Sequence, residues 1–96
     1  MPHYRKKPIT IKAITFDEFV AYGLLNPDNP PNVQNGMPWS FKYKGFHATH
    51  ENNDCYIIMT NNGYQTFKRG EMLITSPHGD VYPCDRDEFE AMYELV

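Results

Sequence analysis

Apolar and polar residues alternate along several short segments of this chain, a pattern typical of half-buried β-strands. Residues 9–13, ITIKA, show this pattern near the N-terminus. Trp39, Phe41 and Tyr43 alternate with polar residues and give the clearest strand pattern of all. Residues 55–60, CYIIMT, are almost continuously apolar, so this strand is expected to be largely covered on both faces.

Turn residues divide the last third of the chain into short strands. Residues 61–63, NNG, predict a hairpin turn because Asn and Gly tolerate positive φ. Further turns are expected at residues 68–71, around Gly70, and at residues 76–80, where Pro and Gly are spaced for a tight reversal. The strands between these turns are expected at residues 64–67, 72–75 and 81–82, with Pro83 ending the last strand or placing it at an edge.

Helix signals occur at two places. Thr15 and Glu18 have the spacing of a capping box. Apolar residues then recur at helical spacing over residues 16–25, and an Asn-Pro pair ends the pattern. Asp85 is expected to cap a second helix, with Glu88 at the capping-box position and an apolar side that contains Phe89, Met92 and Tyr93.

These elements predict an α+β fold. We expect a small, strongly twisted antiparallel sheet or a partly open barrel, with one or two short helices packed on one side. The length of 96 residues predicts a single domain over residues 1–96. Residues 26–38, NPDNPPNVQNGMP, are rich in Asn and Pro and are expected to form a solvated loop; a role in binding is the alternative.

Charge and composition narrow the classes of partner. The net charge is −3, which argues against binding of duplex DNA. The cluster Arg5-Lys6-Lys7 is expected to be a solvated basic end. No apolar run reaches transmembrane length and no leader segment is visible, so we expect a cytoplasmic protein with reduced thiols and no membrane contact.

Residues with metal-binding or nucleophilic side chains are few. His47, His50, Cys55 and Cys84 are a conceivable zinc set, but the spacing of the two histidines on a strand turns them to opposite faces. Cys84 precedes the second helix and has His78 as its nearest candidate base. A buried structural cysteine is the more frequent case. We therefore expect no metal, no cofactor and no catalytic residues.

Aromatic residues are dense on the predicted strands. Most are needed for the core, but exposed ones provide the kind of surface that binds a protein or stacks on a nucleotide. The predicted binding residues are Trp39, Lys42, Tyr43, Lys44, His47, His50, Arg69 and Tyr82.

The two ends of the chain carry motifs that occur together in one family. Residues 4–13, YRKKPITIKA, and residues 69–96, RGEMLITSPHGDVYPCDRDEFEAMYELV, resemble small proteins of tailed bacteriophages and prophages of the PGDYG type. Relatives often have Pro-Gly-Asp where this chain has Arg69-Gly70-Glu71, and Gly70 retains the turn chemistry. The resemblance implies phage origin, action in the bacterial cytoplasm and an accessory role. It implies no reaction.

Three functions are consistent with these features. The leading hypothesis is a non-enzymatic accessory protein that binds a host or phage macromolecule, most concretely an inhibitor of a host enzyme or of an anti-phage defence system. The alternative is a protein that binds or sequesters a nucleotide signal, using aromatic faces together with Arg5, Lys6, Lys42, Lys44 and Arg69. The third is a metal- or thiol-dependent enzyme. Homo-oligomers are compatible with each, and the idiosyncratic residues 26–54 are the expected location of the function.

Overall fold

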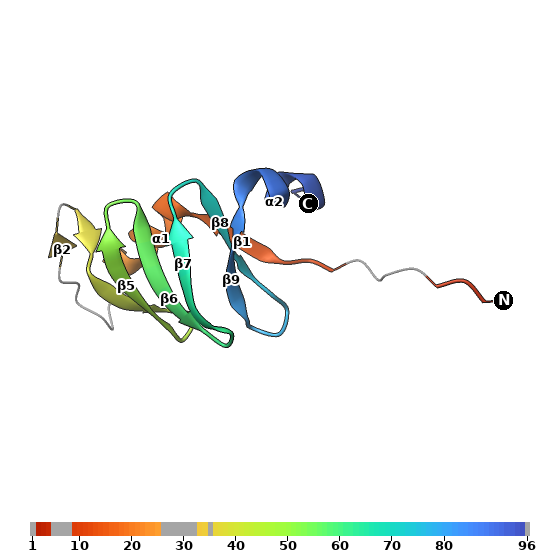
Figure 1. The fold of residues 1–96 in the computed structure, drawn as a ribbon, viewed down its shortest axis with the longest axis horizontal. Coiled ribbons are helices and arrows are strands. Elements are labelled where there is room, and N and C mark those ends of the chain that lie inside the picture. The colour runs from red at the N-terminus through yellow and green to blue at the C-terminus, as the bar shows by residue number, and fades with distance from the viewer. Residues whose placement is uncertain (1, 5–8, 26–32, 35, 96) are drawn as a thin grey trace.

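The fold is known from a computed structural model, which describes residues 2–4, 9–25, 33–34 and 36–95. It contains two antiparallel sheets, a short strand pair and two helices, so the predicted α+β class is confirmed. The two sheets lie side by side and are not closed into a barrel (Figure 1). Among the described residues, neither helix is long and apolar enough to span a membrane.

The larger sheet is a four-stranded meander. Its strands follow one another in the order β4-β5-β6-β7, and each pairs antiparallel with the next. Lys44 and Gly45, with φ of 52° and 86°, form the tight turn between β4 and β5. The predicted NNG turn joins β6 to β7. The strands are β4 (Ser40–Tyr43), β5 (Phe46–Asn52), β6 (Cys55–Thr60) and β7 (Gly63–Lys68).

The smaller sheet combines the two ends of the chain. It has the order β1-β8-β9, with β8 in the centre. Pro83 lies within the edge strand β9, the edge position that its missing N–H group favours. Its strands are β1 (Lys12–Thr15), β8 (Glu71–Thr75) and β9 (Val81–Asp85). The expected strand over residues 9–13 thus begins later, because only Lys12 onward pairs with β8.

The chain leaves the larger sheet at the turn around Gly70. β7 ends at Lys68 and β8 begins at Glu71, yet the two strands belong to different sheets. The predicted turn around Gly70 therefore joins two sheets and does not connect paired strands. β8 instead pairs with β1, which precedes it by more than fifty residues. This pairing brings the N-terminal segment beside the C-terminal helix.

The first helix, α1 (Phe16–Leu25), covers the inner face of the larger sheet (Figure 1). Its capping box forms as predicted, because the Thr15 amide donates to Glu18 Oε1 at 2.9 Å and the Glu18 amide donates to Thr15 Oγ1 at 3.2 Å. Phe19 is fully buried, and the centroid of its ring lies 4.9–5.3 Å from those of the core aromatics Phe41, Tyr43, Tyr56 and Phe67. These rings form the centre of the core.

The second helix, α2 (Arg86–Met92), is less embedded. Its predicted cap forms, because one Asp85 carboxylate oxygen accepts from the amides of Asp87 and Glu88 at 3.1 and 3.3 Å. None of the helix residues is buried. Met92 is 63% exposed. Its packing contacts are with β8 and β9 of the smaller sheet.

Two further expectations are settled by burial and pairing. The CYIIMT strand is covered on both faces at its start, but Met59 is 46% exposed, so coverage on both faces is wrong at that end. The expected loop over residues 26–38 falls partly outside the described residues. Within it, β2 (Val33–Gln34) pairs with β3 (Met37–Pro38), and the Met37 and Pro38 side chains are buried. The segment therefore contributes to the core as well as to the surface.

Candidate functional site

Two of the predicted binding residues lie on the outer face of the larger sheet. Lys42 and His47 are directly opposite each other in the β4–β5 register, and both are exposed. The Ser40 Oγ and His47 Nε2 atoms are 3.2 Å apart, within hydrogen-bonding distance. The same face carries Met59 opposite Tyr64, of which Tyr64 is 73% exposed. This face is mixed in character and solvated.

Tyr43 lies on the inner face and is only 4% exposed. Its ring packs against Phe19, so it belongs to the core rather than to a stacking surface. Burial raises the pKa of the Tyr43 phenol. Its contact with the Thr75 hydroxyl lowers this pKa, but by less, so the net shift is upward. Lys44 follows at the turn, with its Nζ 5.9 Å from the Tyr43 ring centroid.

Trp39 and His50 form a stacked pair. Their ring centroids are 5.1 Å apart with an interplanar angle of 23°, and the His50 amide donates to the Trp39 carbonyl at 2.8 Å. Both His50 ring nitrogens are buried, and among the described residues neither has a hydrogen-bond partner. His50 shares the inner face of β5 with Ala48, whereas His47 is on the outer face, as their spacing predicted.

Arg69 holds three segments together at the turn between the sheets. Its Nε contacts Asp54 Oδ1 at 2.9 Å and its Nη1 contacts Asp17 Oδ1 at 3.0 Å. Its Nη2 donates to the Asn53 carbonyl at 2.8 Å, and the guanidinium carbon lies 4.7 Å from the centroid of the Phe16 ring. The structure thus gives this predicted binding residue several partners within the fold.

Cys55 and Cys84 do not form a disulfide with each other. Burial raises the pKa of the Cys84 thiol, and the nearby carboxylates of Glu88 and Asp85 raise it further. His78 lies in the β8–β9 turn, at the opposite end of β9 from Cys84. The burial of Cys84 and the carboxylates near it disfavour the thiolate form of this cysteine. Within the ranges that the structure describes, no group of three or more His, Cys, Asp or Glu side chains is placed to hold a metal ion.

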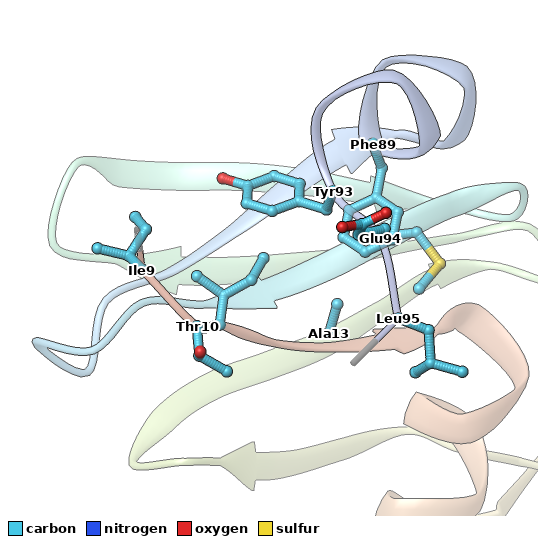
Figure 2. Close-up of a pocket in the computed structure, with 9 residues that line it drawn as sticks. Ile9, Thr10, Ala13, Phe89, Tyr93, Glu94 and Leu95 are labelled. Atoms are coloured by element: carbon cyan, nitrogen blue, oxygen red, sulfur yellow. The ribbon is translucent and has the colours of Figure 1, made fainter. Parts of the chain in front are cut away.

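An apolar cleft lies between α2 and the segment that leads into β1, and we call it the α2 cleft (Figure 2). Its volume is about 250 Å³. Ile9 and Leu95 belong to its wall and are also strongly exposed, at 56% and 101%. Its lining residues are Ile9, Thr10, Ile11, Ala13, Met72, Phe89, Tyr93, Glu94 and Leu95.

On the aromatic side of the α2 cleft, two lining residues pack against each other. Phe89 and Tyr93 stack one helical turn apart, with ring centroids 5.3 Å apart and an interplanar angle of 30°. Tyr82, a predicted binding residue, is half-buried, and its pKa is raised by burial and then by interaction with the Tyr93 phenol. In Figure 2 the Tyr93 side chain extends over the cleft toward Ile9. The wall of the cleft is therefore a packed aromatic pair.

The surroundings of the α2 cleft are acidic. Residues 85–94, DRDEFEAMYE, contain five acidic residues and one basic residue. Arg86 Nε pairs with Glu90 Oε1 at 3.3 Å, which leaves a surplus of negative charge along the helix. Glu94 itself lines the cleft. An apolar floor bordered by carboxylates favours a ligand that is both apolar and positively charged.

A second, polar cavity of about 270 Å³ lies at the other end of the smaller sheet, and we call it the lysine pocket. It is formed where the segment before β1, the β4–β5 turn and the β8–β9 turn meet. Two lysines, three hydroxyl residues and a glycine with φ of 90° contribute to it. Its lining residues are Thr10, Lys12, Lys44, Thr75, Ser76, Pro77 and Gly79.

The comparisons with known proteins give no relative. No family model, no curated protein and no solved structure matches this chain.

The structure does not gather the eight predicted binding residues into one place. Lys42 and His47 lie on the outer sheet face, Tyr43 and His50 on the inner face, and Arg69 at the turn between the sheets. The residues of the α2 cleft were not among those predicted. One signal pointed to them, because Phe89, Met92 and Tyr93 give a short, strongly charged helix an apolar side that such a helix cannot fully bury.

Proposed function

We propose that this chain is a phage-encoded, non-enzymatic accessory protein that binds a host protein through the α2 cleft. The observation that supports it best is the exposed apolar surface around that cleft. None of the residues of α2 is buried; Met92 at the end of this helix is 63% exposed, and Leu95 in the wall of the cleft is 101% exposed. Exposed apolar surface of this kind, rimmed by polar residues, is typical of protein-binding sites.

The chemistry of the α2 cleft specifies the bound segment. Its volume of about 250 Å³ accommodates one or two large side chains and not a folded domain. The acidic rim adds a requirement for positive charge in the flanking residues. We therefore propose that the bound segment carries an apolar anchor, Leu or an aromatic residue, next to Lys or Arg.

Charge also distinguishes a host protein from a second copy of this chain. In a two-fold symmetric contact through α2, the helix would face its own carboxylates. Asp87, Glu88 and Glu94 would then approach the same three residues of the other copy, and like charges in contact oppose association. A basic partner gains from the same arrangement. The negative charge of α2 therefore favours a different protein as the occupant.

The resemblance of both chain ends to PGDYG-type proteins supports the biological setting of this proposal. It implies phage origin and action in the cytoplasm of the host bacterium. The concrete form is inhibition: a chain that occupies the basic, apolar segment of a host enzyme or defence protein keeps that segment from its own partner. The raised pKa of the Cys84 thiol supports a mode of action by binding rather than by nucleophilic chemistry.

Site-specific photocrosslinking in the host tests this proposal. A photoreactive phenylalanine analogue replaces Met92, which is exposed on α2 and precedes the cleft residue Tyr93, or Met59, on the outer sheet face, as a matched control. We expect a host protein to be crosslinked from position 92 and not from position 59, and we expect the additional change Phe89→Ala to abolish the adduct. The identified protein, once purified, should lose activity when the wild-type chain is added and keep it when the Phe89→Ala chain is added.

Two results would contradict the proposal. Equal crosslinking from positions 59 and 92 would remove the α2 cleft as the binding site. An adduct with a second copy of this chain alone would replace the host partner by self-association. Circular dichroism and thermal unfolding of the Phe89→Ala chain serve as the folding control. If this variant is folded and still forms no adduct, the loss is due to the changed cleft and not to unfolding.

A further inference from the structure

We propose that the lysine pocket binds a hydroxyl-rich phosphate monoester, such as a sugar phosphate. This second site shares only Thr10 with the α2 cleft, so its occupancy does not depend on the function proposed above. The proposal rests on the charge, the hydrogen-bonding groups and the size of the pocket.

Positive charge converges on the pocket from two separate elements. Lys12 begins β1, and Lys44 is in the turn between β4 and β5. Among the described residues, neither lysine forms an ion pair with a carboxylate. The adjoining turn carries one acidic residue, Asp80, whose carboxylate accepts a hydrogen bond from the Asn61 side chain. Two lysine charges match the dianion of a phosphate monoester above its second pKa of about 6.

The backbone conformation of Lys44 supports a role beyond the turn itself. Its φ of 52° makes it the only non-glycine residue with positive φ within the described part of the chain. Asn or Gly favours this position in a two-residue hairpin, whereas a lysine is strained there by about 1 kcal/mol. Strain of this kind is concentrated at functional sites. The strained conformation of Lys44 occurs at a residue that lines the pocket and carries an ammonium group.

Hydroxyl groups complete the polar lining. Ser76 Oγ accepts from the Asp80 amide at 3.1 Å, which leaves its own proton available to a ligand oxygen. Thr75 belongs to the wall of the pocket, but its Oγ1 is buried next to the Tyr43 phenol and does not face the ligand. Thr10 contributes a third hydroxyl residue.

The size and lining of the pocket define the rest of the ligand. A volume of about 270 Å³ exceeds what inorganic phosphate fills, since water occupies about 30 Å³ in the liquid. Aromatic rings are not among the lining residues, and nucleobases are bound mainly by stacking on such rings. The lining therefore favours a polyol or sugar over a base as the esterified group. Of the nucleotide ligand that the sequence suggested as an alternative, only the phosphate and the sugar fit this pocket.

The test is a titration of the full chain, labelled with ¹⁵N, with ribose 5-phosphate, ribose or inorganic phosphate. We expect ribose 5-phosphate to shift the amide signals of Lys44, Ser76 and Gly79 and to saturate. Ribose should leave them unchanged, and inorganic phosphate should bind about tenfold or more weakly than the ester because it fills less of the pocket. Equal binding of ribose and its phosphate, or equal binding of phosphate and the ester, would overturn the proposal.

The variant Lys44→Asn removes the lysine charge while retaining the conformation of the turn. Asn adopts positive φ readily, so this variant should be at least as stable as the wild-type chain. Loss of one charged contact should weaken binding of ribose 5-phosphate about tenfold or more. Lys42→Asn makes the same change in net charge on the outer sheet face and should alter the affinity less than twofold. Similar losses for both variants would show a nonspecific effect of charge and would contradict the site.

Discussion

The two helices of this chain start with similar chemistry and end in different surroundings. Each begins with a side-chain cap: the Thr15–Glu18 box for α1 and the Asp85 carboxylate for α2. Phe19 of α1 is fully buried, whereas no residue of α2 is buried. The comparison shows that a good cap and an apolar side make a helix without specifying what will cover that side.

The sheets explain the difference. α1 packs against strands of both sheets, so its aromatic residues complete one continuous core. α2 follows the edge strand β9 and packs mainly against β8 and β9 of the smaller sheet. The apolar face of α1 therefore completes the core, whereas the apolar face of α2 borders the α2 cleft. Four predictions test this division, and the first has the largest expected effect.

Phe19→Ala should lower the free energy of unfolding by about 3–5 kcal/mol, because it removes a ring packed against four other aromatic rings. Phe89→Ala in α2 should cost less than about 1.5 kcal/mol, since Phe89 is only half-buried. Urea denaturation of both variants measures the difference. Phe19→Leu is the control and should cost about 1.5 kcal/mol or less if it repacks. Equal losses for the two alanine variants would contradict the division.

Gly23→Ala should also destabilise the protein, by about 1–2 kcal/mol, although alanine is the better helix former. A Cβ atom at Gly23 would lie 2.7 Å from Phe41 Cε1 and 2.7 Å from Pro38 Cγ. The exposed residue Ala21 provides the control, because Ala21→Gly should cost about 1 kcal/mol through helix propensity alone. Thermal unfolding checks both. A stabilising Gly23→Ala would mean that α1 does not press closely on β3 and β4.

The Tyr56 phenol gives the core a pH dependence at alkaline pH. Burial raises its pKa from 10.0 to about 12, and its hydroxyl donates to the Pro38 carbonyl at 2.6 Å. Between these two pH values the unfolded chain releases the proton while the folded chain retains it. Stability is therefore fully present below pH 10 and falls as the pH rises toward about 12.

Urea denaturation at a series of pH values from 9 upward measures this fall. Tyr56→Phe should be less stable at pH 9, because the Pro38 carbonyl loses its donor, and should show a smaller decrease above pH 10. Tyr64→Phe, at a residue that is 73% exposed, should retain the wild-type decrease. A profile unchanged by Tyr56→Phe would show that this hydroxyl is not held in the core.

The caps provide the smallest and most direct comparison. Thr15→Ala should lower the global free energy of unfolding by about 1 kcal/mol, because α1 unfolds only with the core. Asp85→Ala removes a similar cap from α2, but we expect a global change below about 0.5 kcal/mol, with the loss confined to the helix. Hydrogen exchange of the amides in residues 86–92 should accelerate. A global loss equal to that of Thr15→Ala would show that α2 is part of the cooperative core.

Local sequence signals predicted the elements well because their causes act within a few residues. The capping residues Thr15 and Asp85 hydrogen-bond to amides two or three positions away, and Gly63 supplies positive φ for the turn between β6 and β7. The start of β1 was less well predicted. Its alternating pattern extends to Ile9, but the strand begins where β8 provides a partner.

Local signals could not predict which residues would share a surface. Arg69 was expected to bind a ligand, but the turn between the two sheets places Asp17 and Asp54 within reach of its guanidinium. Tyr43 has the alternation of a strand residue, and only the position of α1 decides that its ring is buried. Such contacts join residues far apart in sequence, and no local preference encodes them.

The amino-acid sequence by itself thus determined the α+β class, both helices and their caps, and most of the turns. The tertiary structure alone decided that the chain changes sheets after β7 and that β1 joins β8. Those two events bring Ile9 and Leu95 into the lining of the same α2 cleft, and Lys12 and Lys44 into the lining of the same lysine pocket. The physical reason is that hydrogen bonds and φ preferences act locally, whereas a cleft depends on which distant segments pack together.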